Sequence, residues 1–439
     1  MLLNSLSKKS LQFQFERLRN NKLLKTGFNY SIISSIKSFV SMGTGILAML
    51  WLAPAEIGLW SSIAIIQSYI PFFQLGIQNG LNRDLPILLG QNNQNRAMEL
   101  VANAKAIAFS VMLFLLMAGT VTTLVLFIIG TDIAYVLGIL TISVIAVSET
   151  MRIHLIATFR SANAFDKLTK LYLIDIALSL ILIFSIYKYH YYGLLIYYGL
   201  SAIASAFFMY MYAPYKKIKL KFNKEPIVSL TKTGLILMSF NQLRQAGPTI
   251  PKWIILSFGN VTKLGLFSPA NAIGGLMTML PNQIAQFFTP QMGYKFGQTG
   301  KAKNLWPYVK KVLILFPLIS VPISICIWLA APWLLETFFP KYIDSLWAMR
   351  IMTVGFVFSS SATTQGVLYS IKAYKYAYIY SLVEIAGYFL CPIFFVKFSS
   401  FDILTSVALG ISCLSVFLYF LNAFLMRKVL FLDKFNGIG

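Results

Sequence analysis

The sequence predicts an all-α polytopic membrane protein, with about twelve transmembrane helices in two six-helix lobes related by a pseudo-twofold axis. Three observations predict this fold class. The composition is 57% hydrophobic and only 12% charged, with a mean hydropathy of +0.71, whereas a globular domain has about 25% charged residues. Apolar stretches of about 20 residues, the length that crosses ~30 Å of hydrocarbon, recur along the chain. The second half of the chain also repeats the first.

An ungapped repeat with a spacing of 207 residues relates the two halves. It places Lys37 on Arg244, and with a two-residue shift it places Asp175 on Glu384. Parallel repeats are typical of transporters in which two lobes surround a central pathway. The repeat therefore predicts a two-lobed transporter. The clearest matches are Lys25-Thr26-Gly27 with Lys232-Thr233-Gly234, Gly58-Leu59 with Gly265-Leu266, and Gly90-Gln91 with Gly297-Gln298.

Apolar segments long enough to cross the membrane define the predicted elements. The first six spans form a predicted N-lobe over 26–213, and the last six form a predicted C-lobe over 230–425. The intervening segment 214–229 is basic and poor in apolar residues, which predicts a cytoplasmic linker. The predicted spans are 28–53, 57–81, 101–129, 133–157, 168–187, 192–213, 230–257, 264–289, 307–331, 344–369, 376–396 and 402–425.

The two ends of the chain are predicted to lie on the cytoplasmic side. Of the 37 Lys and Arg residues, 27 fall on the side of the termini if both are cytoplasmic, and the opposite side holds only Lys188, Lys263, Lys341 and Lys397. Positive residues concentrate in cytoplasmic segments, so this bias sets the orientation. It also accounts for most of the net charge of +23 without a nucleic-acid partner.

The terminal segments outside the lobes are also basic. Residues 1–25 combine apolar side chains with basic ones, which predicts a basic amphipathic helix on the anionic inner leaflet. A solvated tail is the alternative for this segment. Residues 426–439 are predicted as a cytoplasmic C-terminal tail.

The stretch from Leu52 to Gly90 resembles a known family. It is similar to the polysaccharide-transporter branch of the multidrug/oligosaccharidyl-lipid/polysaccharide (MOP) flippase superfamily, which includes the O-antigen (Wzx-type) flippases. The similarity lies in the turn, in the end of the second span and in the basic inner loop. The resemblance implies a MATE-like fold. Structurally, the same residues can form a tight turn and a small-xxx-small helix contact. The matching residues are Pro54, Gly58 and Trp60, then Leu75-Gly76-Ile77, Gly80 and Arg83.

Ionisable residues inside the spans are the candidate functional groups, because a charge at mid-membrane costs about 2.5–3.5 kcal/mol or more. Lys37 and Arg244 lie at similar depth, ~15 Å from the inner end of their spans, and Asp175 and Glu384 lie at ~10–12 Å. Lys37 is predicted to pair with Asp175, and Arg244 with Glu384. The cations are predicted to line a central cavity for an anionic substrate; snorkelling or pairing for helix packing is the alternative.

Further charged residues extend this predicted cavity. Lys252 follows Arg244 on a segment that Gly247, Pro248 and Pro251 interrupt, and broken backbone at membrane depth is tolerated where it lines a cavity. Glu149 and Arg152 form a third group, for which an interfacial cluster is the alternative. Arg350 is predicted to meet a departing substrate, or else to snorkel outward.

The resemblance implies a flippase for undecaprenyl-pyrophosphate-linked oligosaccharides such as O-antigen units, located in the bacterial inner membrane. It implies that membrane lipids, a polysaccharide polymerase and a chain-length regulator are partners. Arg suits such a substrate because its planar fork of donors matches phosphate. Proton or sodium coupling stays open, and no other cofactor is expected.

Two alternatives to the flippase have specific sequence requirements. A cation-coupled multidrug exporter of the same superfamily would place acids at the lobe interior, whereas the first span offers Lys37 and no carboxylate. A membrane enzyme of polysaccharide assembly would need a large outer loop, and no Gly-rich phosphate loop, nucleophile elbow or metal-ligand spacing is present. The sequence therefore favours a transporter over an enzyme.

Overall fold

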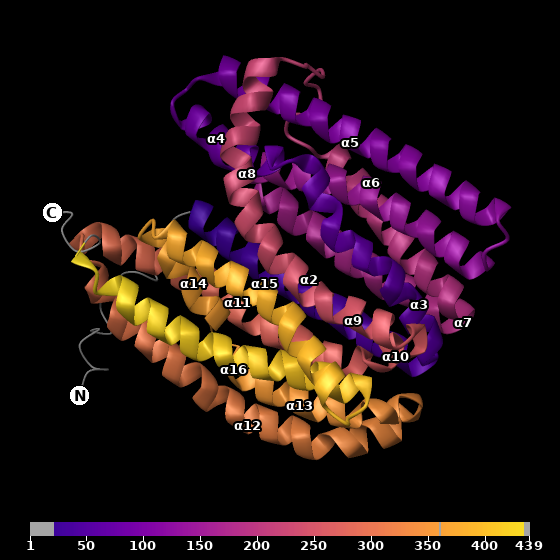
Figure 1. The fold of residues 1–439 in the computed structure, drawn as a ribbon. Coiled ribbons are helices and arrows are strands. Elements are labelled where there is room, and N and C mark those ends of the chain that lie inside the picture. Colours follow the sequence, from indigo (N-terminus) through magenta and orange to yellow (C-terminus); the bar gives the residue numbers. More distant parts are fainter. Residues whose placement is uncertain (1–21, 360, 434–439) are drawn as a thin grey trace. The chain divides into compact units, whose positions relative to one another are not determined.

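The structure is a computed structural model that describes residues 22–359 and 361–433, and every regular element in that part of the chain is a helix (Figure 1). Seven helices within it are long and apolar enough to cross a membrane. This confirms the predicted all-α polytopic membrane protein. The predicted surface helix over 1–25 lies outside the described residues, except that 22–25 begin the first described helix.

Close contacts divide the chain into two compact units. The first unit contains the chain up to Thr44 together with Ile70–Ser239, and the second contains Gly45–Tyr69 and the chain from Phe240 onward. Each unit therefore takes segments from both halves of the sequence. The predicted lobes over 26–213 and 230–425 are based on the sequence repeat and have other bounds than these two units. The lobes stay a prediction.

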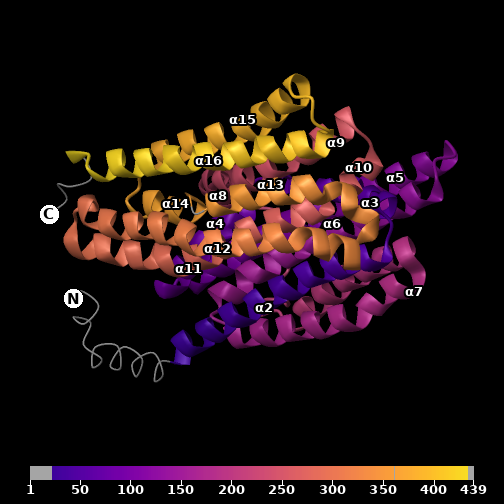
Figure 2. The ribbon, with the colours of Figure 1, turned by 90° about the horizontal axis from the view of Figure 1, so that it is seen from below.

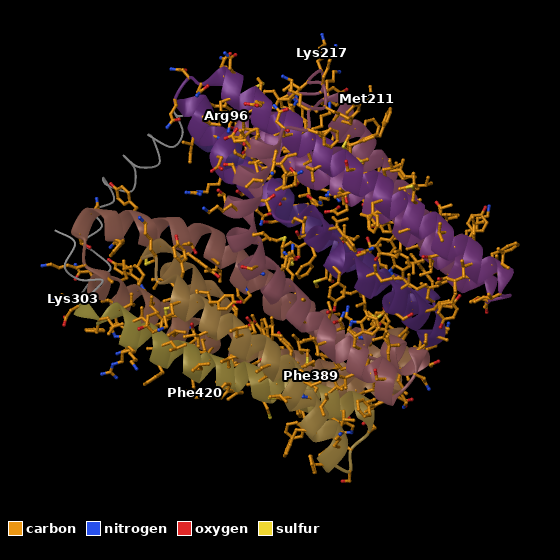
Figure 3. The ribbon with its side chains drawn as sticks, turned by 45° about the horizontal axis from the view of Figure 1, so that its top comes forward. Arg96, Met211, Lys217, Lys303, Phe389 and Phe420 are labelled. Carbon is orange, nitrogen blue, oxygen red and sulfur yellow. The ribbon has the colours of Figure 1, made fainter. Side chains whose placement is uncertain are left out.

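The first unit is a bundle of long helices. Asn93 and Asp132 begin two of them by accepting hydrogen bonds from the backbone N–H groups of Arg96 and Ala134, which satisfies donors that a helix start leaves free. Arg96 and Lys217 lie at the same end of this unit (Figure 3). The helices are α2 (Lys22–Trp51), α4 (Ile77–Gly90), α5 (Gln94–Ile128), α6 (Ile133–Ser161), α7 (Phe165–Met211) and α8 (Lys224–Ala246), of which the ends of α2 and α8 belong to the second unit.

Helix α7 contains two predicted spans, 168–187 and 192–213. His190 has φ 50° and ψ −125° inside it, a positive φ that interrupts the helix. Gly193 follows, and a Cβ there would lie 1.9 Å from the Ser185 carbonyl oxygen. The Ser185 hydroxyl donates to the Gly193 carbonyl at 2.8 Å. The two spans are therefore joined by a turn with almost no loop.

The second unit contains the shorter helices and four further long ones, α11, α12, α15 and α16. Helices α15 and α16 run side by side in both views (Figures 1 and 2). Phe389 and Phe420 point outward from them (Figure 3), as lipid-facing side chains do. The elements are α3 (Pro54–Ala64), η1 (Ile65–Gln74), η2 (Gly247–Thr249), α9 (Ile250–Phe258), α10 (Val261–Leu266), α11 (Ser268–Thr299), η3 (Ala302–Leu305), α12 (Trp306–Phe338), η4 (Pro340–Ser345), α13 (Leu346–Val357), α14 (Ser361–Ser370), α15 (Tyr374–Phe398) and α16 (Ile403–Leu430).

Besides the span over 230–257, whose interruption was expected, two predicted spans are not continuous helices, and their prediction as such was wrong. The span predicted over 57–81 is helix α3, then a 3-10 segment, and then a break at Leu75 and Gly76, which have φ 47° and 75°. Pro71 lacks a backbone N–H and weakens the helix before this break. The span predicted over 344–369 is η4, α13 and α14. Element ends also differ, since α8 begins at Lys224 and α16 extends to Leu430.

The repeat-related glycines Gly58 and Gly265 meet in the second unit, where α3 crosses α10. Pro54 is the first residue of α3, so Gly58 lies inside a helix and not in a turn. A Cβ on Gly58 would lie 1.9 Å from the Val261 carbonyl oxygen, and a Cβ on Gly265 would lie 1.7 Å from that of Pro54. Pro54 and Val261 are themselves 207 residues apart. The contact is therefore reciprocal, as expected on a pseudo-twofold axis.

Replacing Gly265 with alanine should strongly destabilise the protein, because its Cβ would overlap a backbone oxygen that cannot move without displacing α3. Overpacking of this kind costs about 1–3 kcal/mol or more. Thermal unfolding of the detergent-purified variant measures the loss. Gly43→Ala on α2 is the matched control, since no atom of the described residues lies within 4 Å of a Cβ there. Equal stability of the two variants would contradict the close crossing.

Candidate functional site

A cavity of about 480 Å³ lies in the second unit, beside the interruption between α8 and α9. Residues of α11, α13, α15 and α16 complete its wall. Its lining combines apolar side chains with polar groups that carry amides, hydroxyls and two opposite charges. Polar residues in this wall include Gln245, Thr249, Lys252, Asn271, Asn282 and Glu384.

The helix interruption follows directly from its sequence. Gly247-Pro248-Thr249 forms a 3-10 turn between α8 and α9, which confirms the break expected from these residues. Gly247 also permits a close approach of α15, because a Cβ would lie 2.8 Å from the Tyr388 ring. The Tyr69 and Thr249 hydroxyls lie 3.0 Å apart, and the Trp253 indole donates to Tyr69. These contacts fix the start of α9, which carries Lys252.

Two consecutive glycines on α11 leave space in the cavity. A Cβ on Gly275 would meet nothing within 4 Å, whereas one on Gly274 would lie 3.2 Å from the terminal methyl of Met352. Both glycines line the cavity. A Cβ at Gly275 would therefore enter the cavity without meeting a described atom within 4 Å.

Lys252 and Glu384 both line this cavity. Among the described residues, no carboxylate lies within 4.0 Å of the Lys252 ammonium. Glu384 and Lys252 thus face one space without forming an ion pair. The side chain of Arg244 lies outside the described part of the structure, so its predicted pairing with Glu384 stays a prediction; its backbone belongs to α8.

Lys37 and Asp175 form an ion pair in the first unit, as predicted. Lys37 belongs to α2, and Asp175 belongs to the part of α7 that precedes His190. The Ser205 hydroxyl donates to the same carboxylate oxygen at 3.0 Å, and the Lys37 ammonium lies 4.5 Å from the centre of the Tyr172 ring. Asp175 is only 8% exposed. The pair therefore joins two helices within the membrane-spanning part of the unit.

Glu149 and Arg152 form their own ion pair at 2.6 Å on α6. Both lie within electrostatic range of Lys37. The buried Nε of Arg152 has no hydrogen-bond partner in the described part of the chain. The nearby His154 is buried and bonds the Gln78 side chain at 3.0 Å. The first unit thus groups two cations and two acids.

Arg350 lies apart from the cavity, between two tryptophans. Its guanidinium carbon is 5.5 Å from the Trp328 ring centre and 5.4 Å from that of Trp347. Its Nε donates to the Trp328 carbonyl at 3.3 Å. Such cation–π stacking stabilises the guanidinium, which has no carboxylate within 4.0 Å among the described residues.

Several cavity residues were not identified from the sequence, among them Asn271, Asn282 and Thr249. The amides on α11 were a usable signal, because polar residues are rare in a span and usually face the bundle interior. Thr249 gave no such signal, since a hydroxyl can satisfy itself within its own helix; here it also donates to the Ala246 carbonyl.

Comparison with known proteins gives one family and one fold. A family described as polysaccharide biosynthesis protein matches residues 46–346. No curated protein matches the chain. Among solved structures, an inward-facing multidrug resistance MATE family transporter of the MOP superfamily is 14% identical, with a TM-score of 0.74 over 91% of this chain and 95% of that one.

Other solved transporters show the same fold. An outward-facing structure of a MATE family transporter of the MOP superfamily is 14% identical over 95% of this chain and 98% of that one, with a TM-score of 0.65. A MOP superfamily transporter from Pyrococcus furiosus, described as having a binding pocket of reverse polarity, is 15% identical over 91% and 95%, with a TM-score of 0.53. At these identities the likeness shows the fold alone, and that fold is MATE-like.

Proposed function

Because the chain belongs to the polysaccharide biosynthesis protein family, we propose that it is a flippase. It moves an undecaprenyl-pyrophosphate-linked oligosaccharide, such as an O-antigen repeat unit, from the inner to the outer leaflet of the bacterial inner membrane. It does so by alternating access, with no covalent chemistry. The observation that supports this most is the polar cavity beside the broken helix, with Lys252 in its wall.

The cavity suits a sugar phosphate by the chemistry of its lining. The Lys252 ammonium can donate three hydrogen bonds to phosphate oxygens. The amides of Gln245, Asn271 and Asn282 can both donate and accept, which matches sugar hydroxyls. Among the described residues the Lys252 ammonium has no carboxylate within 4.0 Å, so it can bind an anionic group directly. Arg244, near the end of α8, is proposed as a second cation that binds the same substrate.

Replacing Lys252 with alanine should lower surface glycan at least tenfold in a strain that lacks its own flippase, because the phosphate loses its cationic partner. Lys252→Arg should retain part of the activity. Surface glycan is measured beside membrane protein level. Lys341→Ala is the matched control, since Lys341 is exposed and outside the cavity. Full glycan display by Lys252→Ala at normal abundance would exclude a role for this ammonium in transport.

A cation-coupled multidrug exporter is the second candidate, favoured by the Glu384 carboxylate in the cavity wall. In that case Glu384→Gln should remove resistance to cationic drugs, and the chain should not restore surface glycan. Under the flippase proposal, Glu384 is instead the group that would bind a coupling proton or sodium ion. Glycan display and drug resistance, measured in the same strain, separate the two candidates.

A further inference from the structure

An apolar groove of about 330 Å³ lies between α12 and α13 in the second unit. Several of its lining side chains are exposed on the outside of the bundle: Leu329 is 71% exposed, Ile325 53% and Val354 44%. The groove is held together by the Ser324 hydroxyl, which donates from α12 to the Thr353 carbonyl of α13 at 3.0 Å. It is therefore a concave apolar strip that opens toward lipid.

Arg350 gives this groove a charged edge. Trp328 lines the groove and also stacks on the Arg350 guanidinium, so the two features share a side chain. Only the Arg350 Nε has a protein acceptor in the described part of the structure. Its other N–H groups are available in a fork that matches phosphate oxygens. A ligand that fits both features has a hydrocarbon chain and an anionic head.

Phe358 connects the groove to the polar cavity, because it lines both. Phe358 directly follows the last residue of α13, where the predicted span is interrupted. On the same helix, Met352 faces the cavity, whereas Thr353 and Val354 face the groove. Helix α13 thus forms a wall with a polar space on one side and an apolar groove on the other.

We propose that the groove between α12 and α13 binds the hydrocarbon chain of the lipid-linked substrate, with Arg350 pairing to its phosphate before the head group enters the cavity that contains Lys252. This rests on the proposed function. A groove between two adjacent helices accommodates one chain, which fits a single-chain polyprenyl lipid better than a two-chain glycerophospholipid. The chain would stay in the hydrocarbon while the polar head crosses, which avoids transferring apolar surface into a polar cavity.

A photo-crosslinking amino acid at Val354 tests this directly. It is incorporated into the full-length chain in cells that make the polyprenyl-pyrophosphate-linked glycan and lack any other flippase. Mass spectrometry then identifies the lipid adducts. Val125 on α5 is the matched control, because it is 50% exposed and lies outside the groove. We expect polyprenyl adducts to be at least tenfold more abundant at position 354 than at position 125.

The same experiment is repeated in the Arg350→Ala and Arg350→Lys backgrounds. The adduct at position 354 should fall at least fivefold with alanine and be partly restored with lysine, at unchanged membrane abundance. Equal adducts at both positions, only glycerophospholipid adducts, or no adduct would overturn the proposal. Surface glycan from the wild-type chain reports the proposed function separately. Glycan display without a polyprenyl adduct would overturn only the proposal that the groove binds the hydrocarbon chain. Absence of glycan display would overturn the proposed flippase function.

Discussion

Replacing Gly275 with tryptophan should abolish transport and leave the protein folded. A Cβ at this position meets no described atom within 4 Å, and the residue lines the 480 Å³ cavity. An indole there would fill space that the substrate head requires, without overlapping any described atom near the backbone. Complementation of a flippase-deficient strain, scored for surface glycan and membrane abundance, measures the effect. We expect at least a hundredfold loss of glycan at normal abundance.

Gly297→Trp is the matched control for this change. Gly297 lies on the same helix, α11, and is exposed, and a Cβ added there would also meet none of the described atoms within 4 Å. It does not line the cavity. The control should therefore display glycan normally. Normal display by Gly275→Trp would show that the substrate does not pass through this cavity.

Replacing Asp175 with asparagine should cause a large loss of stability. The substitution leaves the Lys37 ammonium without its carboxylate, in a site that Tyr172 and Ser205 only partly solvate. Removing one partner of a buried ion pair costs about 3–5 kcal/mol. Thermal unfolding of the purified protein and its abundance in membranes both measure the effect. Asp166→Asn, a change in the first turn of α7 outside this pair, should alter stability by no more than about 0.5 kcal/mol.

The double variant Lys37→Met with Asp175→Asn separates packing from substrate binding. Removing both charges should recover much of the lost stability, because no buried charge is left without a partner. If the double variant also transports normally, the pair serves helix packing alone. If it is stable but inactive, Lys37 contributes to the pathway. A single Asp175→Asn variant as stable as the wild type would contradict the buried pair itself.

Several features could be predicted from the sequence because they depend on few residues. The ion pair of Lys37 with Asp175 followed from matched depth, since a charge in the membrane requires a partner. The break at Gly247-Pro248 followed from covalent constraints on the backbone. The contact of Gly58 with Gly265 is a consequence of the repeat, although the repeat alone did not identify which residues would meet.

Other features depend on tertiary contacts that no local pattern specifies. Leu75 has a positive φ, and nothing in an apolar stretch marks a leucine for that conformation. Residues 45–69 come from the first half of the sequence but belong to the second unit. This grouping depends on packing between segments far apart in sequence. The polar cavity collects residues from α9, α11 and α15, whose relative rotations are set by side-chain packing and not by hydropathy.

Reconstitution in liposomes tests the central claim most directly. Purified protein is placed in vesicles that contain a polyprenyl-pyrophosphate oligosaccharide with a fluorescent label on the sugar, and a membrane-impermeant quencher reports the fraction of label in the outer leaflet over time. The wild-type chain should expose the inner-leaflet label at least tenfold faster than protein-free vesicles, and Gly275→Trp should not. A wild-type rate equal to that of empty vesicles, or a Gly275→Trp rate equal to that of wild type, would contradict transport through this cavity.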